Sequence, residues 1–274
     1  MKTPSSSARS TRRGILATGA TVAAGLAGCL GFVGPDVTES GSLAFDVPGG
    51  VVTVGNRNGD VEIGPHDGDD VLVEYRKAGR SQAAIDAVTV EGSVEDGDLA
   101  VRSVHGDRFR NVGVDLTVLV PDGGRVGAVE TANGDAVVRE VAGDVRASTT
   151  NGDARAIDVD GYVTVQSGNG DAEARGTTGL SGARSANGSV SVEIHALRGA
   201  TDVTSANGDV EAGVAPDLDA EVLATVGNGD LDVEVELDGA STAANRVRGR
   251  LGDGGPLLTV TTGNGDVRLY ELSG

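Results

Sequence analysis

The stretch that decides the fold of this chain is Val129-Glu-Thr-Ala-Asn-Gly-Asp-Ala-Val-Val138, because close copies of it follow at residues 147–156 and 165–174. In each copy, apolar or small residues alternate with polar ones on both sides of an Asn-Gly dipeptide. An alternation with a period of two predicts half-buried β-strands. Asn-Gly favours the positive φ angles of a tight turn. Each copy is therefore predicted to fold as a strand, a turn and a second strand.

The Asn-Gly turn recurs along most of the 274 residues, as Asn-Gly-Asp seven times and as Asn-Gly-Ser once. The asparagines are Asn58, Asn133, Asn151, Asn169, Asn187, Asn207, Asn228 and Asn264. From Asn133 onward they are 18, 18, 18, 20, 21 and 36 residues apart. We take the last interval as two periods, with Asn245 near the missing point. A period of this size indicates one supersecondary unit that stacks on itself.

The repeat predicts an all-β fold, a β-solenoid with coils of about 18–21 residues. Positions four and two before each asparagine, and three and five after it, hold mostly Val, Ala, Ser or Thr. A second turn is marked ten residues after the asparagine by Gly143, Gly161 and Gly179. The aliphatic positions do not recur every six residues, which disfavours a left-handed hexapeptide helix. We expect a right-handed or flattened solenoid over residues 127–274.

Residues 43–126 keep the β character but lose the regular repeat. Strands are predicted at 71–75, 88–91, 99–104 and 114–120, joined by Asp-Gly turns, with one short helical turn at 81–87. An open solenoid end exposes unpaired strand groups that invite aggregation. We therefore expect this segment to be a β-rich cap on the N-terminal end of the solenoid.

The amino-acid composition indicates a narrow, aliphatic core and excludes one class of partner. The chain has 44 Gly, 3 Phe, 3 Tyr and no Trp, which suits a narrow lumen filled by Val and Ala. The net charge of −19 excludes nucleic-acid binding through a basic face. One cysteine, Cys29, forms neither an internal disulfide nor a zinc site.

Residues 1–28 resemble a twin-arginine export signal of the lipoprotein type. Arg12 and Arg13 precede a mildly apolar stretch that is too short and Gly/Ala-rich to span a bilayer stably. Leu26-Ala-Gly-Cys29 has the form of a lipoprotein box. We expect lipid on Cys29, a linker over residues 29–42, and a location on the extracellular face of the cell membrane. The alternative is an ordinary membrane anchor with a chance cysteine.

Removal of this signal changes the charge of the chain. Residues 1–28 carry four basic and no acidic side chains, so the −19 of the whole chain becomes −23 for the remainder. Acidity of this degree, with Arg and almost no Lys, resembles that of secreted proteins from salt-in haloarchaea.

The domain resembles the putative adhesin family of β-solenoid surface domains, a family of unassigned biochemical role. The likeness covers about residues 43–272. It rests on an opening strand at 45–47, residues 54–61 with their Asn-Gly-Asp, residues 71–73, residues 118–121, and the repeats from Val129 onward. The resemblance implies an extracellular solenoid with an adhesive or scaffolding role, and it brings no catalytic residues.

The asparagine column is expected to be structural. We expect its side chains to turn into the corner of each coil and to bond to the coils above and below. Two positions later, Asp135, Asp153 and Asp171 stand in neighbouring coils. At a spacing of about 4.8 Å, adjacent carboxylates repel by about 0.9 kcal/mol in water, which molar salt screens. No metal is therefore required, and calcium bridging by these three residues is the alternative.

No cofactor or catalytic site is predicted. His66, His105 and His195 lie far apart in the sequence, and no nucleophile or phosphate-loop motif occurs. Asn187-Gly-Ser is the one N-glycosylation sequon, and it is usable only if Asn187 is exposed.

The leading hypothesis for function is a non-enzymatic, membrane-anchored surface protein in adhesion or envelope scaffolding, with envelope glycans or surface proteins as partners. The alternatives are a polysaccharide-active β-helical enzyme and a cation- or ligand-binding envelope sensor. Residues 237–256, which include Arg246, Arg248 and Arg250, are the one substantial excursion expected from the coils. These arginines would meet an anionic glycan or balance nearby aspartates.

Overall fold

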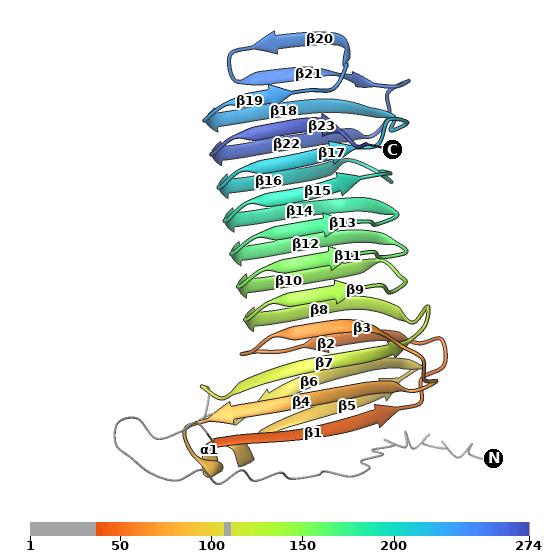
Figure 1. The fold of residues 1–274 in the computed structure, drawn as a ribbon, viewed down its shortest axis with the longest axis vertical. Coiled ribbons are helices and arrows are strands. Elements are labelled where there is room, and N and C mark those ends of the chain that lie inside the picture. The colour runs from red at the N-terminus through yellow and green to blue at the C-terminus, as the bar shows by residue number, and fades with distance from the viewer. Residues whose placement is uncertain (1–36, 107–110, 274) are drawn as a thin grey trace, which may run out of the picture.

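The computed structural model describes residues 37–106 and 111–273. Its strands build two long sheets that stack into a flattened, two-sided solenoid, with the N-terminal strands at one end and a hairpin at the other (Figure 1). The prediction of an all-β, flattened solenoid with a β-rich N-terminal part is confirmed. One helix lies in the described residues, α1, Gln82–Asp86, and Ser81 caps its N-terminus.

The strands divide between the two sheets, which we call sheet A and sheet B. In spatial order, sheet A contains β1 (Val37–Phe45), β4 (Val71–Gly79), β7 (Gly113–Pro121), β3 (Val61–His66), β9 (Ala136–Arg139), β11 (Ala154–Ile157), β13 (Ala172–Arg175), β15 (Val190–Ile194), β17 (Val210–Val214), β23 (Val267–Glu271) and β19 (Leu231–Val233). Sheet B contains β20 (Asp238–Ala243), β21 (Arg246–Leu251), β18 (Ala220–Asn228), β22 (Leu257–Asn264), β16 (Thr201–Asn207), β14 (Gly179–Asn187), β12 (Tyr162–Asn169), β10 (Val145–Asn151), β8 (Arg125–Asn133), β2 (Val51–Gly55), β6 (Asp98–His105) and β5 (Val88–Glu95).

Each Asn-Gly turn joins a strand of sheet B to a strand of sheet A, so one repeat contributes one strand to each sheet. Neighbouring coils pair in parallel with equivalent residues opposite one another, as Asn151 stands opposite Asn133 and Asn169. A whole coil is thereby in register with the next. This arrangement explains why the same residue types recur in fixed columns.

The core is the narrow space between the two sheets. Ala147 and Val165 of sheet B and Ala154 and Val190 of sheet A are completely buried. Coils with only two short strands leave no room for rings at these positions, so Val and Ala fill the lumen. Burial of such side chains, each about 0.8 kcal/mol per CH₂ group, is the main apolar contribution of a coil.

The N-terminal part covers one end of the solenoid with antiparallel strands. In sheet A, β4 pairs with both β1 and β7, and in sheet B, β5 and β6 form a hairpin around Asp96 and Gly97. Strand β1 starts at Val37, so residues 37–42, which we predicted to be linker, belong to the folded domain. The sequence missed this strand because its Ser and Gly residues resemble those of a tether. Phe45, predicted to open a strand, ends β1 instead.

The last repeats do not stack in chain order, and here the prediction of two equal periods between Asn228 and Asn264 is wrong. After β18 and β19, the chain forms the antiparallel hairpin β20–β21 on the outer side of β18. It then returns, and β22 enters between β16 and β18 while β23 enters between β17 and β19. Asn245 lies in the turn between β20 and β21 and starts no coil.

Candidate binding face and turn ladders

The eight repeat asparagines form a continuous ladder, which we call the asparagine ladder, along one edge of the solenoid. Seven hydrogen bonds of 2.8–3.0 Å join Nδ2 of each asparagine to Oδ1 of the asparagine in the preceding coil. Asn151, for example, donates to Asn133 and accepts from Asn169. Every internal member therefore both donates and accepts, as an amide does and a carboxylate cannot.

The orientation of these side chains differs from our expectation. Seven of the eight asparagines, from Asn133 to Asn264, are exposed, and Asn58 is half-buried. They do not turn into the corner. The inward position nearest the turn is taken by the residue two places earlier, a Ser or Thr in six coils. Strict alternation would point both residues to the same face, so the alternation ends before the asparagine.

The inward hydroxyls form a second row of contacts. Thr149 Oγ1 donates to the carbonyl oxygen of Gly134 at 2.8 Å, and Ser167 repeats this contact with Gly152 at 2.7 Å. The same bond occurs, at 2.7–3.0 Å, from Thr131, Ser185, Ser205 and Thr262. Val226 stands at the equivalent position of β18 and has no hydroxyl. The hydroxyls explain why polar residues are tolerated among the buried positions.

Glycine is required at the second turn position for two reasons. Gly152 has φ of 133°, and a Cβ atom there would lie 2.2 Å from the carbonyl oxygen of Gly134 in the preceding coil. Its own N–H donates to the carbonyl oxygen of Asn169 in the following coil at 2.9 Å. The turn thus brings two coils into direct backbone contact.

The aspartates of the turn form a third row, which we call the aspartate row. Oδ1 of Asp135 accepts from the backbone N–H of Asp153 at 2.8 Å, and Asp153 accepts in the same way from Asp171. The guanidinium of Arg155 bridges the carboxylates of Asp135 and Asp153 and also contacts Glu173. The positive charge of Arg155 thus offsets the repulsion between these close carboxylates. In residues 37–106 and 111–273, no group of three or more His, Cys, Asp or Glu side chains is arranged to hold a metal ion.

The insertion of the C-terminal coil also changes the neighbours in the aspartate row. Asp209 and Asp230 belong to consecutive Asn-Gly-Asp repeats but do not lie in adjacent coils. Asp266 lies between them, since its N–H donates to Asp209 Oδ1 and its own Oδ1 accepts from the N–H of Asp230.

The remaining predicted site residues are spread over the surface. His66 contacts the carbonyl oxygen of Asp70, His105 lies 3.3 Å from Ser103 Oγ, and His195 is exposed. Asn187 is exposed, and Nδ2, the atom that would carry a glycan, donates to Asn169 at 2.9 Å. Cys29, Arg12 and Arg13 lie outside the described residues.

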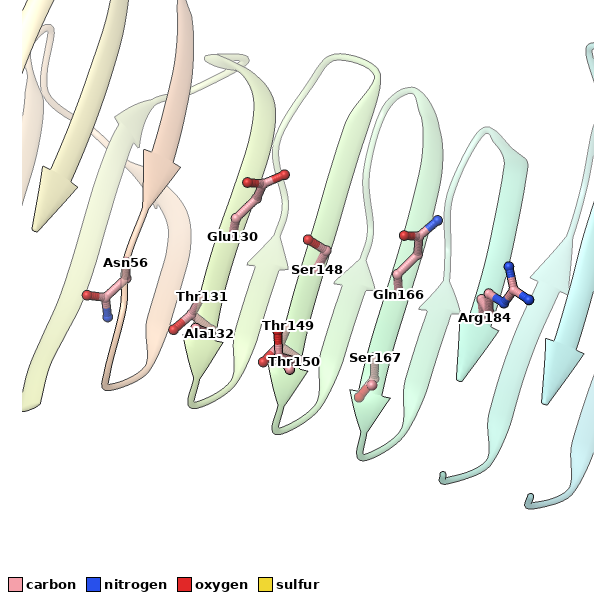
Figure 2. Close-up of a pocket in the computed structure, with 11 residues that line it drawn as sticks. Asn56, Glu130, Thr131, Ala132, Ser148, Thr149, Thr150, Gln166, Ser167 and Arg184 are labelled. Atoms are coloured by element: carbon pink, nitrogen blue, oxygen red, sulfur yellow. The ribbon is translucent and has the colours of Figure 1, made fainter. Parts of the chain in front are cut away.

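A polar groove crosses the outer face of sheet B, and it is the candidate binding face. It runs over β8, β10, β12 and β14, encloses about 380 Å³, and is lined at successive strands by Glu130, Ser148, Gln166 and Arg184 (Figure 2). Asn56 closes one end and belongs also to an adjoining hollow of about 510 Å³ over β2 and β6. The groove therefore extends across the strands.

Side-chain contacts fix part of this groove. Arg146 donates to Gln166 Oε1 at 2.6 Å and lies 3.8 Å from Glu130. At the end of the groove, the side-chain amide of Asn56 accepts a hydrogen bond from Ser103 Oγ and donates one to the carbonyl oxygen of Val114. The groove thus offers amides, hydroxyls, one carboxylate and the guanidinium of Arg184 on a rigid sheet. Our sequence reading missed the groove, although Glu130, Ser148, Gln166 and Arg184 occupy one outward column, three positions before an asparagine.

A second organised group lies at the opposite turn of the coils. Arg198 contacts the carboxylate of Asp144 at 2.5 Å, and its guanidinium carbon lies 3.6 Å from the centre of the Tyr162 ring. The hydrogen bond from Arg198, together with one from the N–H of Tyr162, holds the pKa of Asp144 below its ordinary value. At the C-terminal end, the Arg268 hydrogen bonds lower the pKa of Glu234 in the same way.

Within the described part of the chain, no helix is long and apolar enough to cross a membrane.

These features define a class of protein, namely a two-sided β-solenoid whose coils are joined by polar ladders and whose broad sheet face carries a shallow polar groove. The chain belongs to the Toastrack DUF4097 family, whose model matches residues 51–270. No curated protein matches the chain significantly.

Solved structures with a related chain course include a putative cell adhesion protein from Clostridium sporogenes, at 12% identity and a TM-score of 0.35, covering 86% of this chain and 100% of that one. A putative adhesin from Bacteroides fragilis has 10% identity and a TM-score of 0.35, with coverage of 85% and 97%. A putative lipid binding protein from Parabacteroides distasonis has 12% identity and a TM-score of 0.41, with coverage of 86% and 97%.

Proposed function

We propose that this chain is a non-enzymatic surface protein in adhesion or envelope scaffolding, and that the groove on sheet B contacts an extended polar partner such as an envelope glycan. The observation that carries the proposal is the groove itself, which presents Glu130, Ser148, Gln166 and Arg184 at successive strands. Strands repeat about every 4.8 Å, so the groove offers evenly spaced donors and acceptors to a polymer lying across them.

The groove supports binding better than glycoside hydrolysis. A glycosidase needs two carboxylates flanking the bond to be cleaved. Glu130 is the one carboxylate among the residues that line the groove and its adjoining hollow. Side chains such as Gln166, held by Arg146, are already ordered before a partner arrives, which reduces the entropy lost on binding.

A binding assay with matched variants tests this function. The full chain with Cys29→Ser, which has no lipid acceptor, is immobilised and exposed to purified envelope glycans and envelope proteins in molar salt. We expect Gln166→Ala with Arg184→Ala to weaken binding by about tenfold or more, as loss of one charged and one neutral hydrogen bond requires. Ser191→Ala with Glu211→Ala, on the outer face of sheet A, serves as the control. Equal binding by both pairs would refute the groove as the contact surface.

The membrane location rests on the sequence of residues 1–29 and is part of the same proposal. Twin-arginine export directed by Arg12 and Arg13 and lipid on Cys29 would place the domain on the outer face of the membrane, with β1 nearest the anchor. Cell fractionation measures this directly. We expect Cys29→Ser to release the chain from the membrane fraction, and continued membrane association of that variant would count against lipid anchoring.

A further inference from the structure

The C-terminal coil lies out of chain order, as does the coil of β2 and β3, which lies between β6 and β7 on one side and β8 and β9 on the other. Strands β22 and β23 fill a gap one coil wide, bounded by β16 and β17 on one side and by β18 and β19 on the other. Neighbouring strands are about 4.8 Å apart, so the flanking coils are held about 9.6 Å apart by this insertion. The gap is a binding slot for a strand–turn–strand segment, and residues 257–271 occupy it.

The slot holds its occupant through every type of contact found in the ladders. Leu258, Val260, Val267 and Leu269 are completely buried between the two sheets. Hydrogen bonds reach the turn of this coil from both sides: Asn264 donates to Asn207 and accepts from Asn228, each at 2.9 Å.

The occupant is attached to the rest of the domain by a short hinge. Strand β21 ends at Leu251 and β22 begins at Leu257, so the connection is Gly-Asp-Gly-Gly-Pro, residues 252–256. Gly252 and Gly254 have positive φ angles of 52° and 81°. Three glycines in five residues make this the segment where the chain can most readily change direction.

We propose that the C-terminal coil exchanges between two copies of this chain, with residues 257–271 of each copy filling the slot of the other. An exchanged pair keeps every contact of the slot and changes only the hinge, which is why such exchange has a low energetic cost. The partner is a second copy, because the slot recognises the Thr-x-Asn-Gly-Asp turn, with Thr262, Asn264 and Asp266 each bonded to a neighbouring coil. Copies held close together on one surface would favour the exchange by raising their effective concentration.

Disulfide trapping tests the exchange. Thr204 of β16 and Thr261 of β22 stand opposite one another on the outer face, at a strand spacing that a disulfide can span. One full chain carries Thr204→Cys, the other carries Thr261→Cys, and both carry Cys29→Ser. The two are refolded together at increasing concentration and then oxidised. We expect disulfide-linked heterodimers whose yield rises with concentration.

A matched pair controls for non-specific contact. Ser148 and Gln166 occupy the same column in adjacent inner coils, which the proposal does not allow to exchange. Chains with Ser148→Cys and with Gln166→Cys, treated identically, should give no heterodimer above background. Equal yields from the two pairs would overturn the proposal.

Shortening the hinge provides a second measurement. Deletion of residues 252–255 leaves only Pro256 between the strands, a reach of at most about 7 Å, while the path around β18 requires about 9.6 Å. The coil then cannot enter its own slot, and we expect light scattering to show a folded dimer. A folded monomer with native stability would contradict the exchange. If this variant does not fold, the comparison of the two cysteine pairs with the natural hinge decides the question.

Discussion

Replacement of a single inward hydroxyl should measure what the second row of turn contacts contributes to stability. Thr149 is about 6% exposed, and its hydroxyl donates to the carbonyl oxygen of Gly134 at 2.8 Å. Thr149→Val keeps the shape of the side chain but removes the donor. An intramolecular hydrogen bond contributes about 0.5–1.5 kcal/mol net, and a buried acceptor left without a partner costs about 1–3 kcal/mol. We therefore expect a loss of about 1–2 kcal/mol.

The measurement is equilibrium unfolding of the full Cys29→Ser chain in molar salt, followed by circular dichroism. A loss of this size in a domain of more than 150 residues corresponds to a fall in Tm of about 2–8 °C. Stacked coils can unfold in parts, so the denaturant m-value must stay unchanged for the comparison to hold. Thr149→Ser, which keeps the hydroxyl and loses a methyl group, separates the hydrogen bond from packing.

The reverse substitution tests the same reasoning independently. Val226→Thr places a hydroxyl at the position where β18 lacks one, facing the coil that contains Gly265. If this donor reaches the Gly265 carbonyl as its equivalents reach theirs, the variant should be at least as stable as the parent, although a buried Val→Thr change is normally destabilising. The reasoning fails if Thr149→Val is as stable as the parent chain, or if Val226→Thr loses as much stability as Thr149→Val.

Three further perturbations follow from the turn and the ion pairs. Gly152→Ala should cost about 3 kcal/mol or more, since it combines a positive φ with a Cβ clash, while Gly64→Ala, where a Cβ meets nothing within 4 Å, should leave the unfolding midpoint nearly unchanged. Asp144 has a lowered pKa in the folded chain, so it contributes stability above its unfolded pKa that is lost as the pH falls through the folded one; Asp144→Asn should therefore lower Tm at neutral pH and flatten the acid side of the Tm profile, and an unchanged profile would contradict this. Millimolar calcium at fixed ionic strength should leave Tm unchanged, because Arg155 already bridges carboxylates of the aspartate row, and a clear rise would restore the calcium alternative.

The sequence correctly predicted the features that repeat in every coil, namely the strands and their buried columns. It did not predict the order in which the last coils stack. Alternation around Asn133 and Asn151 correctly located the strands and the buried Val and Ala columns, because a two-sheet coil exposes every second residue. Because the coils have nearly the same sequence pattern, that pattern did not indicate the order in which the last coils stack. Any strand with matching columns can pair with β16, so nothing in the columns distinguishes β22 from β18 as its neighbour.

Two other errors have local causes. The inward placement of the asparagines followed from strand alternation continued into the turn. The pairing between coils skips the residue before the asparagine, Thr150 in the coil of Asn151, so the alternation does not reach the asparagine. The groove went unrecognised because its residues, among them Ser148 and Gln166, share no chemistry from coil to coil. Only the stacking of the strands shows that they face one surface.

The asparagine ladder has a consequence for the chemical lifetime of the protein. In an Asn-Gly sequence, the glycine nitrogen can attack the side-chain amide carbon of the asparagine, forming a succinimide and releasing ammonia. Here the Gly152 nitrogen is engaged with the carbonyl of Asn169, and the Asn151 amide is held from both sides. Ageing of these amides therefore requires a coil to open first. Deamidation along the ladder would record how often, and at which coil, the stack has come apart.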